Sequence, residues 1–197
     1  MKLLIATTNK GKCTELRDLL KEIPFEIITP RDLGITLEVE ENGDTYDINA
    51  CLKAQAFHDA SGFITLADDT GLEVDALGGR PGVRSARYVE APGATDADRR
   101  AKLLRELKDR PRPWTAHFHC TVAVAAPGTG IQLFGGDVYG EIVTEESGEF
   151  GFGYDRQFQI PEMGKTLAAC TMEEKNLISH RALAVKAAIP YLLSLLE

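Results

Sequence analysis

The sequence has few of the features that mark membrane, secreted or disulfide-bonded proteins. Its cysteines, Cys13, Cys51, Cys120 and Cys170, form no CxxC pair and have no metal-like spacing with histidine. Such scattered thiols are typical of reduced, cytoplasmic proteins. No run approaches the roughly 20 apolar residues that a membrane-spanning helix requires, and the apolar run at residues 2–6 is too short for a secretory signal. We therefore expect a cytoplasmic protein that does not enter a membrane.

Positive charge is also scarce. The 197 residues include 22 Lys and Arg against 30 Asp and Glu, which gives a formal net charge of -8. Proteins that coat nucleic acid rely on clustered basic residues, so this balance argues against a nucleic-acid partner. A small phosphorylated ligand needs only a few lysines in one pocket. With no internal repeat or low-complexity tract, we expect a single domain over residues 1–197, built as one body or two closely joined lobes.

Alternating strand-like and helix-like patterns predict an α/β fold. Apolar runs typical of buried strands lie at residues 2–6, 25–29 and 63–67. Helical patterns cover residues 13–23, 45–62 and 97–108, with a stop at Gly62 and a start at Thr95 and Asp98. Two long β-like runs, 114–126 and 131–144, flank a PGTG turn, and helical sequence from about Met172 is interrupted or kinked near Pro190. This order predicts a long mixed β-sheet flanked by helices, in two lobes with a central cleft.

The stretch TLADDTGLEVDALGGRPGVRSAR, residues 65–87, places two adjacent aspartates after an apolar run. Residues that follow a strand in an open α/β sheet commonly face the ligand, so Asp68 and Asp69 are candidates for a site. Because side chains alternate along extended backbone, only one of the pair should point at the ligand. Such a carboxylate can hold Mg²⁺ or orient an attacking water; alternatively, both aspartates only shape a turn.

A second acidic cluster, LEVEENGDTYD, precedes the helix that carries Lys53. A charge run of this kind is usually a solvated face. Mg²⁺ sites, however, need only one or two carboxylates plus phosphate oxygens, and Glu40 with Asp69 would meet that requirement.

Two further segments could contact a nucleotide. LLIATTNKGKCTEL places Lys10 and Lys12 at a helix entrance, where free N–H groups and the helix dipole favour an anion. It lacks the GxxxxGK[ST] pattern of a Walker loop, and alone it favours an ordinary loop with solvated lysines over a phosphate site. SGEFGFGYD interleaves glycines with Phe150, Phe152 and Tyr154, which could stack on a purine or enter the core.

Near the C-terminus, TMEEKNLISHRA begins with a capping box from Thr171 to Glu174. It then carries Lys175, His180 and Arg181. Alone, a His-Arg pair of this kind is more often a helix-surface feature than a site.

Taken together, seven segments resemble the inosine triphosphate pyrophosphatase family. They are TTNKGKCTE, EENGDTYDINACLKA, ADDTGLEVDALGGRPGVRSARY, FHC, FGFGYD, GKT and EEKNLISHR, and they span nearly the whole chain. Members of this family hydrolyse ITP, dITP and XTP to the monophosphate and pyrophosphate. The resemblance implies purine nucleoside triphosphates as substrates, Mg²⁺ as cofactor and a homodimer.

The resemblance also implies residue roles. Asp69 would be the catalytic proton acceptor and, with Glu40, a ligand of Mg²⁺. Substrate would be bound by Thr7, Thr8, Asn9, Lys10, Gly11, Lys12, Lys53, Thr70, Phe152, Gly153, Tyr154, Asp155, Lys175, His180 and Arg181. Phe152–Asp155 would form one wall of the nucleoside pocket, with Lys175, His180 and Arg181 as the other.

Base choice would follow from hydrogen-bond polarity, because an Arg181 donor suits the C6 oxygen of hypoxanthine and meets a donor in adenine. Three positions depart from the family pattern: Arg84 is more often aromatic, Arg156 is usually Pro, and Ala182 is commonly Gly. Two alternatives stay open. One is a Maf-like nucleotide pyrophosphatase with a different base preference, and the other is a catalytically silent nucleotide-binding protein.

Overall fold

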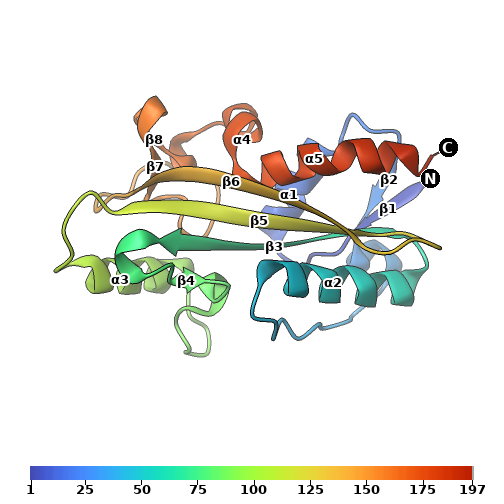
Figure 1. The fold of residues 1–197 in the computed structure, drawn as a ribbon, viewed down its shortest axis with the longest axis horizontal. Helices are drawn as coiled ribbons and strands as arrows, with labels where there is room; N and C mark the ends of the chain where they lie inside the picture. The colour runs from blue at the N-terminus through green and yellow to red at the C-terminus, as the bar shows by residue number, and fades with distance from the viewer. Residues whose placement is uncertain (197) are drawn as a thin grey trace. The chain divides into compact units, whose positions relative to one another are not determined.

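The computed structural model describes residues 1–196 and has a mixed α/β fold built on an eight-stranded sheet (Figure 1). The strands are β1 (Lys2–Ile5), β2 (Glu26–Ile28), β3 (Ile64–Val74), β4 (Pro81–Gly82), β5 (Thr115–Ala125), β6 (Gln132–Ile142), β7 (Phe158–Ile160) and β8 (Lys165–Thr166). The helices are α1 (Lys10–Leu19), α2 (Tyr46–Ser61), α3 (Asp96–Leu107), α4 (Met172–Ile178) and α5 (His180–Ser194).

The sheet is mixed, as the order of elements predicts. Its strands follow the order β2-β1-β3-β5-β6-β7-β8, and β4 pairs with β3. β1 is parallel to both β2 and β3, with Leu4 opposite Ile28 and Thr65. The pairs β3–β4, β6–β7 and β7–β8 are antiparallel. Parallel pairing at β1 requires the crossovers that α1 and α2 supply.

The chain forms two compact units, each assembled from separate stretches of sequence. The first unit comprises Met1–Asp69, Cys120–Gly136 and the residues from His180 onward. The second comprises Thr70–His119 and Asp137–Ser179. Strands β3, β5 and β6 contribute residues to both units.

In the first unit, helices cover both faces of the sheet (Figure 1). On one face, α1 and α5 bury Leu16, Ala184 and Val185 against β1, β3 and β5. On the other face, α2 buries Ala50 and Phe57 with alternate residues of the same strands. Strands buried on both faces are rich in apolar residues along their whole length, which explains the runs LLIA at residues 3–6 and FITLA at residues 63–67.

The second unit has its own apolar core. Leu72 and Val74 of β3 lie with Leu103 and Leu107 of α3 in this core. The rings of Phe118 and Phe158 pack within it, with centroids 4.7 Å apart and the planes tilted by 55°.

Several helix ends confirm the sequence signals. The helix from Thr45 ends at Gly62, which adopts a left-handed φ of 70° that glycine accommodates without steric cost. Capping boxes join Thr95 to Asp98 and Thr171 to Glu174.

Three predicted boundaries are wrong. α1 begins at Lys10 rather than at residue 13, because Asn9 caps it by accepting a hydrogen bond from the Lys12 N–H. β3 does not end at residue 67 but continues to Val74, pairing with β4. The last helical region breaks at Ser179, whose extended backbone ends α4, whereas Pro190 lies inside α5. None of the helices in residues 1–196 is both long and apolar enough to span a membrane.

Candidate functional site

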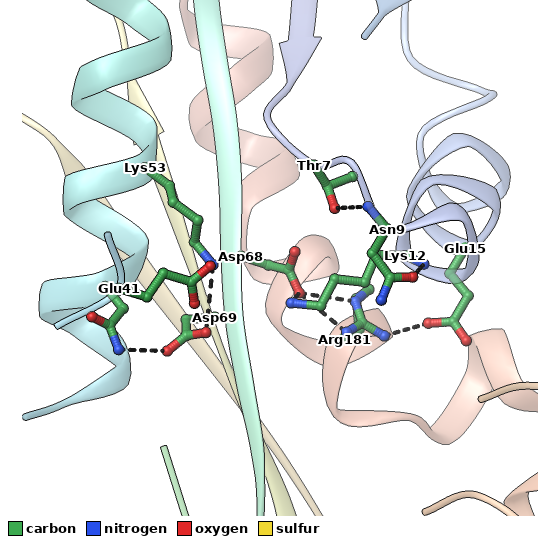
Figure 2. A network of polar contacts seen from close by, with 10 residues as sticks. Thr7, Asn9, Lys12, Glu15, Glu41, Lys53, Asp68, Asp69 and Arg181 are labelled. Atoms are coloured by element: carbon green, nitrogen blue, oxygen red, sulfur yellow. Dashed lines mark hydrogen bonds and ion pairs between the residues drawn. The ribbon is translucent and has the colours of Figure 1, made fainter. Parts of the chain in front are cut away.

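The two aspartates of β3 lie on opposite faces of one strand. Because β3 runs from Ile64 to Val74, Asp68 and Asp69 are within extended backbone, where consecutive side chains alternate. Figure 2 shows Asp68 on the side of Lys12 and Arg181, and Asp69 on the side of Lys53. Both side chains are buried, so neither is a solvent-exposed turn former. The alternation that we predicted is therefore confirmed, and it creates two separate charge clusters.

The cluster at Asp68 joins α1, β3 and α5 (Figure 2). The Asp68 Oδ2 accepts from the Arg181 Nε at 3.2 Å and Nη2 at 3.1 Å, and lies 2.9 Å from the Lys12 Nζ. The third guanidinium nitrogen of Arg181, Nη1, donates to Glu15. Two cations and two anions thus balance in a group that we call the Asp68 quartet: Lys12, Glu15, Asp68 and Arg181. Glu15, Asp68 and Arg181 are buried, and Lys12 is half-buried.

The quartet keeps Asp68 and Arg181 ionised. Burial alone would raise the pKa of Asp68, but the charges of Lys12 and Arg181 outweigh it and hold that pKa well below its usual range. Burial would likewise lower the pKa of Arg181, whereas Asp68 and Glu15 raise it. Charges taken out of water are tolerated only when paired in this way.

The N-terminus of α1 presents polar groups next to the quartet. The Asn9 Oδ1 accepts from the Lys12 N–H at 3.1 Å, and the Thr7 Oγ1 accepts from the Asn9 N–H at 3.2 Å. Lys12 therefore comes from the first turn of a capped helix rather than from a loop. The first turn of a helix has unpaired N–H groups and a partial positive charge, which favour a phosphate there. The neighbouring Thr8 and Lys10 are exposed and Gly11 is half-buried.

The cluster at Asp69 is built by α2 and the segment before it. The Asp69 Oδ2 accepts from the Asn49 Nδ2 at 3.1 Å, and its Oδ1 accepts from the Lys53 Nζ at 3.4 Å. Asn49 and Lys53 are four residues apart and so share one helix face. Asn49 is itself fixed, because its Oδ1 accepts from the Gly43 N–H at 2.8 Å. Lys53 also pairs with the Glu41 Oε1 at 3.2 Å.

Asp69 differs from its neighbour in its affinity for protons. Burial raises its pKa above the usual range and the Glu41 charge adds to this, while Lys53 and Lys12 oppose it. Burial would lower the pKa of Lys53, but Asp68, Asp69 and Glu41 together raise it. One strand therefore carries a strongly acidic carboxyl on one face and a more basic carboxylate on the other, and the more basic carboxylate is suited to accept a proton.

We expected Glu40 to lie with Asp69 as a ligand of the cation, but the structure places a different acid beside Asp69. Glu40 is exposed, whereas Glu41 is the acid of that segment that reaches Lys53 beside Asp69. Among residues 1–196, no group of three or more metal-binding side chains is already assembled. Mg²⁺ sites that use phosphate oxygens need only one or two protein carboxylates, so a full protein cage is not required.

In the second unit, the predicted nucleoside residues Phe152, Asp155 and Lys175 lie together. The Asp155 Oδ2 accepts from the Lys175 Nζ at 2.7 Å and from the Phe152 N–H at 3.0 Å. The Lys175 ammonium lies 5.5 Å from the centroid of the Phe152 ring. Tyr154 is buried and donates its hydroxyl hydrogen to the Ser85 carbonyl at 3.0 Å. The aromatic residues of FGFGYD are therefore divided, with Tyr154 in the core, Phe152 half-buried and Phe150 exposed.

Gly151 allows the close approach of the Asp155 carboxylate. A Cβ at Gly151 would lie 2.1 Å from the Asp155 Oδ2 and 3.1 Å from the Lys175 Nζ. Gly151→Ala should therefore displace the carboxylate, in addition to the strain of an alanine at φ 74°. Gly164→Ala is a matched control, because its φ of 60° imposes similar strain while its Cβ would meet no atom within 4 Å. We expect Gly151→Ala to lose roughly 1–3 kcal/mol more unfolding free energy in urea than the control. Equal losses would show that Asp155 relocates without cost.

The structure thus gathers some predicted residues and adds others. Thr7, Asn9, Lys12 and Arg181 lie around Asp68, and Lys53 lies at Asp69, all in the first unit. Thr70, the next residue of β3, is half-buried, and His180 is buried at the start of α5.

The Arg181 guanidinium is bound by two carboxylates in this structure, and its contact with a base stays a prediction. Sequence reasoning missed Glu15, Asn49 and Glu41. Helix spacing from Lys12 was the available signal for Glu15, and helix spacing from Lys53 was the signal for Asn49. Glu41 lies outside the helices and had no such signal.

These features define a class: an α/β protein with a capped helix N-terminus that favours anions, buried lysines and a carboxylate of raised pKa, an arrangement suited to phosphate chemistry. More particularly, the chain belongs to the Ham1 family, whose model matches residues 3–191. The chain is 46% identical over 193 residues to a protein of Desulforamulus reducens named dITP/XTP pyrophosphatase, covering 98% of this chain and 96% of that protein. A Geobacter sulfurreducens protein of the same name is 43% identical, covering 93% and 92%.

Solved structures agree with this assignment. The Staphylococcus aureus Ham1 protein superposes with a TM-score of 0.86 at 36% identity, covering 98% of this chain and 99% of that chain. A HAM1 protein from Coxiella burnetii gives a TM-score of 0.87 at 34% identity, with coverage of 98% and 99%. The predicted α/β fold and the predicted family are both confirmed.

Proposed function

We propose that this chain is a nucleoside triphosphate pyrophosphatase that hydrolyses dITP, XTP and ITP to the monophosphate and pyrophosphate with the help of a divalent cation. Its curated relatives carry the name dITP/XTP pyrophosphatase over nearly their whole length. The observation that carries the proposal is the contrast within β3, where Asp69 has a raised pKa beside Lys53 while Asp68 is held ionised beside Lys12. This contrast supplies a proton acceptor and two lysines for phosphate charge.

Asp69 acts as the general base in the proposed reaction. Its raised pKa favours uptake of a proton from the water that attacks the α-phosphorus. Asn49 and Lys53 hold its two oxygens from one face of α2, so the carboxylate is oriented before substrate arrives. Pyrophosphate is then the leaving group.

The lysines stabilise the charge that grows on the leaving group. Lys12 enters from the first turn of α1, where backbone N–H groups also favour a phosphate. Lys53 adds a second positive charge at Asp69. The polar residues Thr7, Thr8 and Asn9, together with Lys10, Gly11 and Thr70, are proposed to contact the triphosphate.

A divalent cation, proposed to be Mg²⁺, would be held by Asp69 and Glu40. Carboxylate oxygens fit such a hard cation, and the cation would neutralise phosphate charge and lower the pKa of bound water. Because Glu41 is the acid that meets Lys53, variants of Glu40 and Glu41 should be compared when metal affinity is measured.

The base is proposed to be recognised by Phe152, Gly153, Tyr154 and Asp155 with Lys175, His180 and Arg181. A donor facing the C6 oxygen favours hypoxanthine and xanthine over adenine. Two further proposals are a homodimer, taken from the family resemblance, and a cytoplasmic location, taken from the scattered cysteines.

Product analysis tests the proposed function directly. With Mg²⁺, we expect ITP, dITP and XTP to give monophosphate plus pyrophosphate, with ATP and GTP largely spared, as resolved by anion-exchange chromatography. Chelation with EDTA should abolish turnover, and added Mg²⁺ should restore it. Orthophosphate as product or a pyrimidine preference would contradict the proposal, the latter in favour of a Maf-like enzyme. Tight ITP binding without product would instead indicate a silent nucleotide-binding protein.

A further inference from the structure

The loop that carries the proposed base-binding residues is held at its centre by α3. Gly153 lies between Phe152 and Tyr154 and has a left-handed φ of 62°. Its N–H donates to the Asp96 Oδ2 at 2.8 Å, and its carbonyl accepts from the Arg100 Nη1 at 2.7 Å. Both polar groups of one residue are therefore bound by side chains from one helix. Asp96 and Arg100 are four residues apart, which places them on the same helix face.

Arg100 also holds the segment that leads into this loop. Its Nε donates to the Glu146 Oε1 at 2.8 Å, and its Nη2 donates to the Glu146 Oε2 at 3.2 Å. The Glu146 Oε1 in turn accepts from the Gln157 Nε2 at 3.4 Å, on the far side of the loop. Arg100 thus connects the start, the end and the centre of the segment 146–157.

The chemistry of this contact requires arginine. The guanidinium is planar and has five donors, so it can bind a carboxylate with two nitrogens and a carbonyl with a third. The Arg100 side chain is only 9% exposed, whereas Glu146 is exposed and Gly153 is half-buried. Loss of the arginine would therefore leave the Gly153 carbonyl, rather than the Glu146 carboxylate, with the larger deficit in hydrogen bonding. Lysine, as a single ammonium on a flexible stem, cannot reproduce the fork.

We propose that Arg100, together with Asp96, is a positioning residue that fixes the Gly153 peptide and thereby sets the affinity of Phe152 and Asp155 for the purine base. The inference rests on the proposed function and assigns to α3 a part in base recognition. Arg100 acts through the loop rather than on the reacting phosphates, so its loss should weaken substrate binding and leave the chemical step intact.

The test compares Arg100→Gln with Arg105→Gln, an exposed arginine of the same helix, in steady-state hydrolysis of ITP with Mg²⁺. We expect Arg100→Gln to raise KM about tenfold while kcat stays within about twofold, and Arg105→Gln to change neither. Glu146→Gln, which leaves Arg100 in place but removes its charged partner, should give an intermediate KM. This second variant keeps the test valid should Arg100→Gln fold poorly.

A measurement made without nucleotide tests the positioning role of Arg100 independently of the proposed pyrophosphatase activity. The Gly153 amide donates to Asp96, and its hydrogen exchange, followed by NMR, should be slow in the unchanged protein. Exchange should be about tenfold faster in Arg100→Gln, because the loop opens more often once Arg100 no longer holds the Gly153 carbonyl, and should increase to a smaller extent in Glu146→Gln. Faster exchange with an unchanged KM would overturn the assigned role in base affinity, and unchanged exchange would overturn the positioning role itself. Failure of the unchanged protein to hydrolyse any purine triphosphate would contradict the proposed function, while the exchange experiment would still decide whether Arg100 fixes the loop.

Discussion

Asp69→Asn should reduce the kcat for ITP by about 10²–10⁴-fold, because the amide cannot accept the proton of the attacking water. Nucleotide binding should survive, since the substitution removes a negative charge from a cluster that already contains Lys53. We expect the Kd for ITP to stay within about threefold when calorimetry is done in EDTA, which prevents turnover and removes the cation that Asp69 is proposed to hold. The expected signature is therefore lost turnover with retained affinity.

The matched control for this experiment is Asp59→Asn. Asp59 lies on α2, the helix that also supplies Asn49 and Lys53, but it is exposed and accepts a hydrogen bond from Gln55. Its replacement changes the net charge by the same amount and should leave kcat unchanged. Near-normal turnover in Asp69→Asn with Mg²⁺ would contradict the assignment of the general base. A parallel loss in both variants would point to a general charge effect.

Asp68→Asn should cost roughly 3–5 kcal/mol of unfolding free energy, as expected when one partner of a buried ion pair is removed. The variant leaves Lys12 and Arg181 with Glu15 as the one remaining anion of the quartet. Urea unfolding followed by circular dichroism measures the loss. Glu26→Gln is the control, because the Lys2–Glu26 pair spans 3.8 Å with exposed side chains and should contribute less than about 1 kcal/mol.

The pH dependence of this stability has a defined sign. Because the folded protein holds the pKa of Asp68 below the ordinary value of 3.8, its contribution is fully present above that value. The contribution is lost as the pH falls through the lower pKa of the folded state. The stability difference between the unchanged protein and Asp68→Asn should therefore be constant at neutral pH and shrink only in strong acid. A difference that already shrinks above pH 5 would show that Asp68 is not held ionised.

The elements of the fold were largely predictable because their signals are local. Apolar periodicity located the strands and helices, and Gly62, Thr95 and Thr171 marked helix ends correctly. The errors fell where a local signal was ambiguous. Asn9 is followed three residues later by Lys12 rather than by Glu or Gln, so the sequence contains no capping box that would mark the start of α1. The acidic residues after residue 67 resembled a turn, although they lie within strand β3, which continues to Val74 and pairs with β4 at Leu72 and Glu73.

The partners within the site were less predictable because they depend on contacts distant in sequence. Asp68 and Arg181 are separated by 113 positions, and no local pattern links them. Residue resemblance pointed to Lys53 and Asp69, and the structure brings them together. It did not single out Glu41, which differs from Glu40 only by one position along an irregular segment. Arg100 and Asp96 could not be distinguished by sequence from the other charged residues of the amphipathic helix α3, because the polar face of such a helix is normally solvated.

Because Asp68 and Asp69 point to opposite faces of β3, the odd or even position of a residue along this strand decides which charge cluster it joins. Two carboxylates with opposite pKa shifts are separated by a single peptide bond, and the odd or even place of each in the strand decides its partners. A one-residue insertion or deletion between Ile64 and Asp68 would exchange the faces of the two aspartates. The carboxylate facing Lys53 would then become the one facing Arg181, with every residue type still present. The length of this strand is therefore constrained as strictly as its composition.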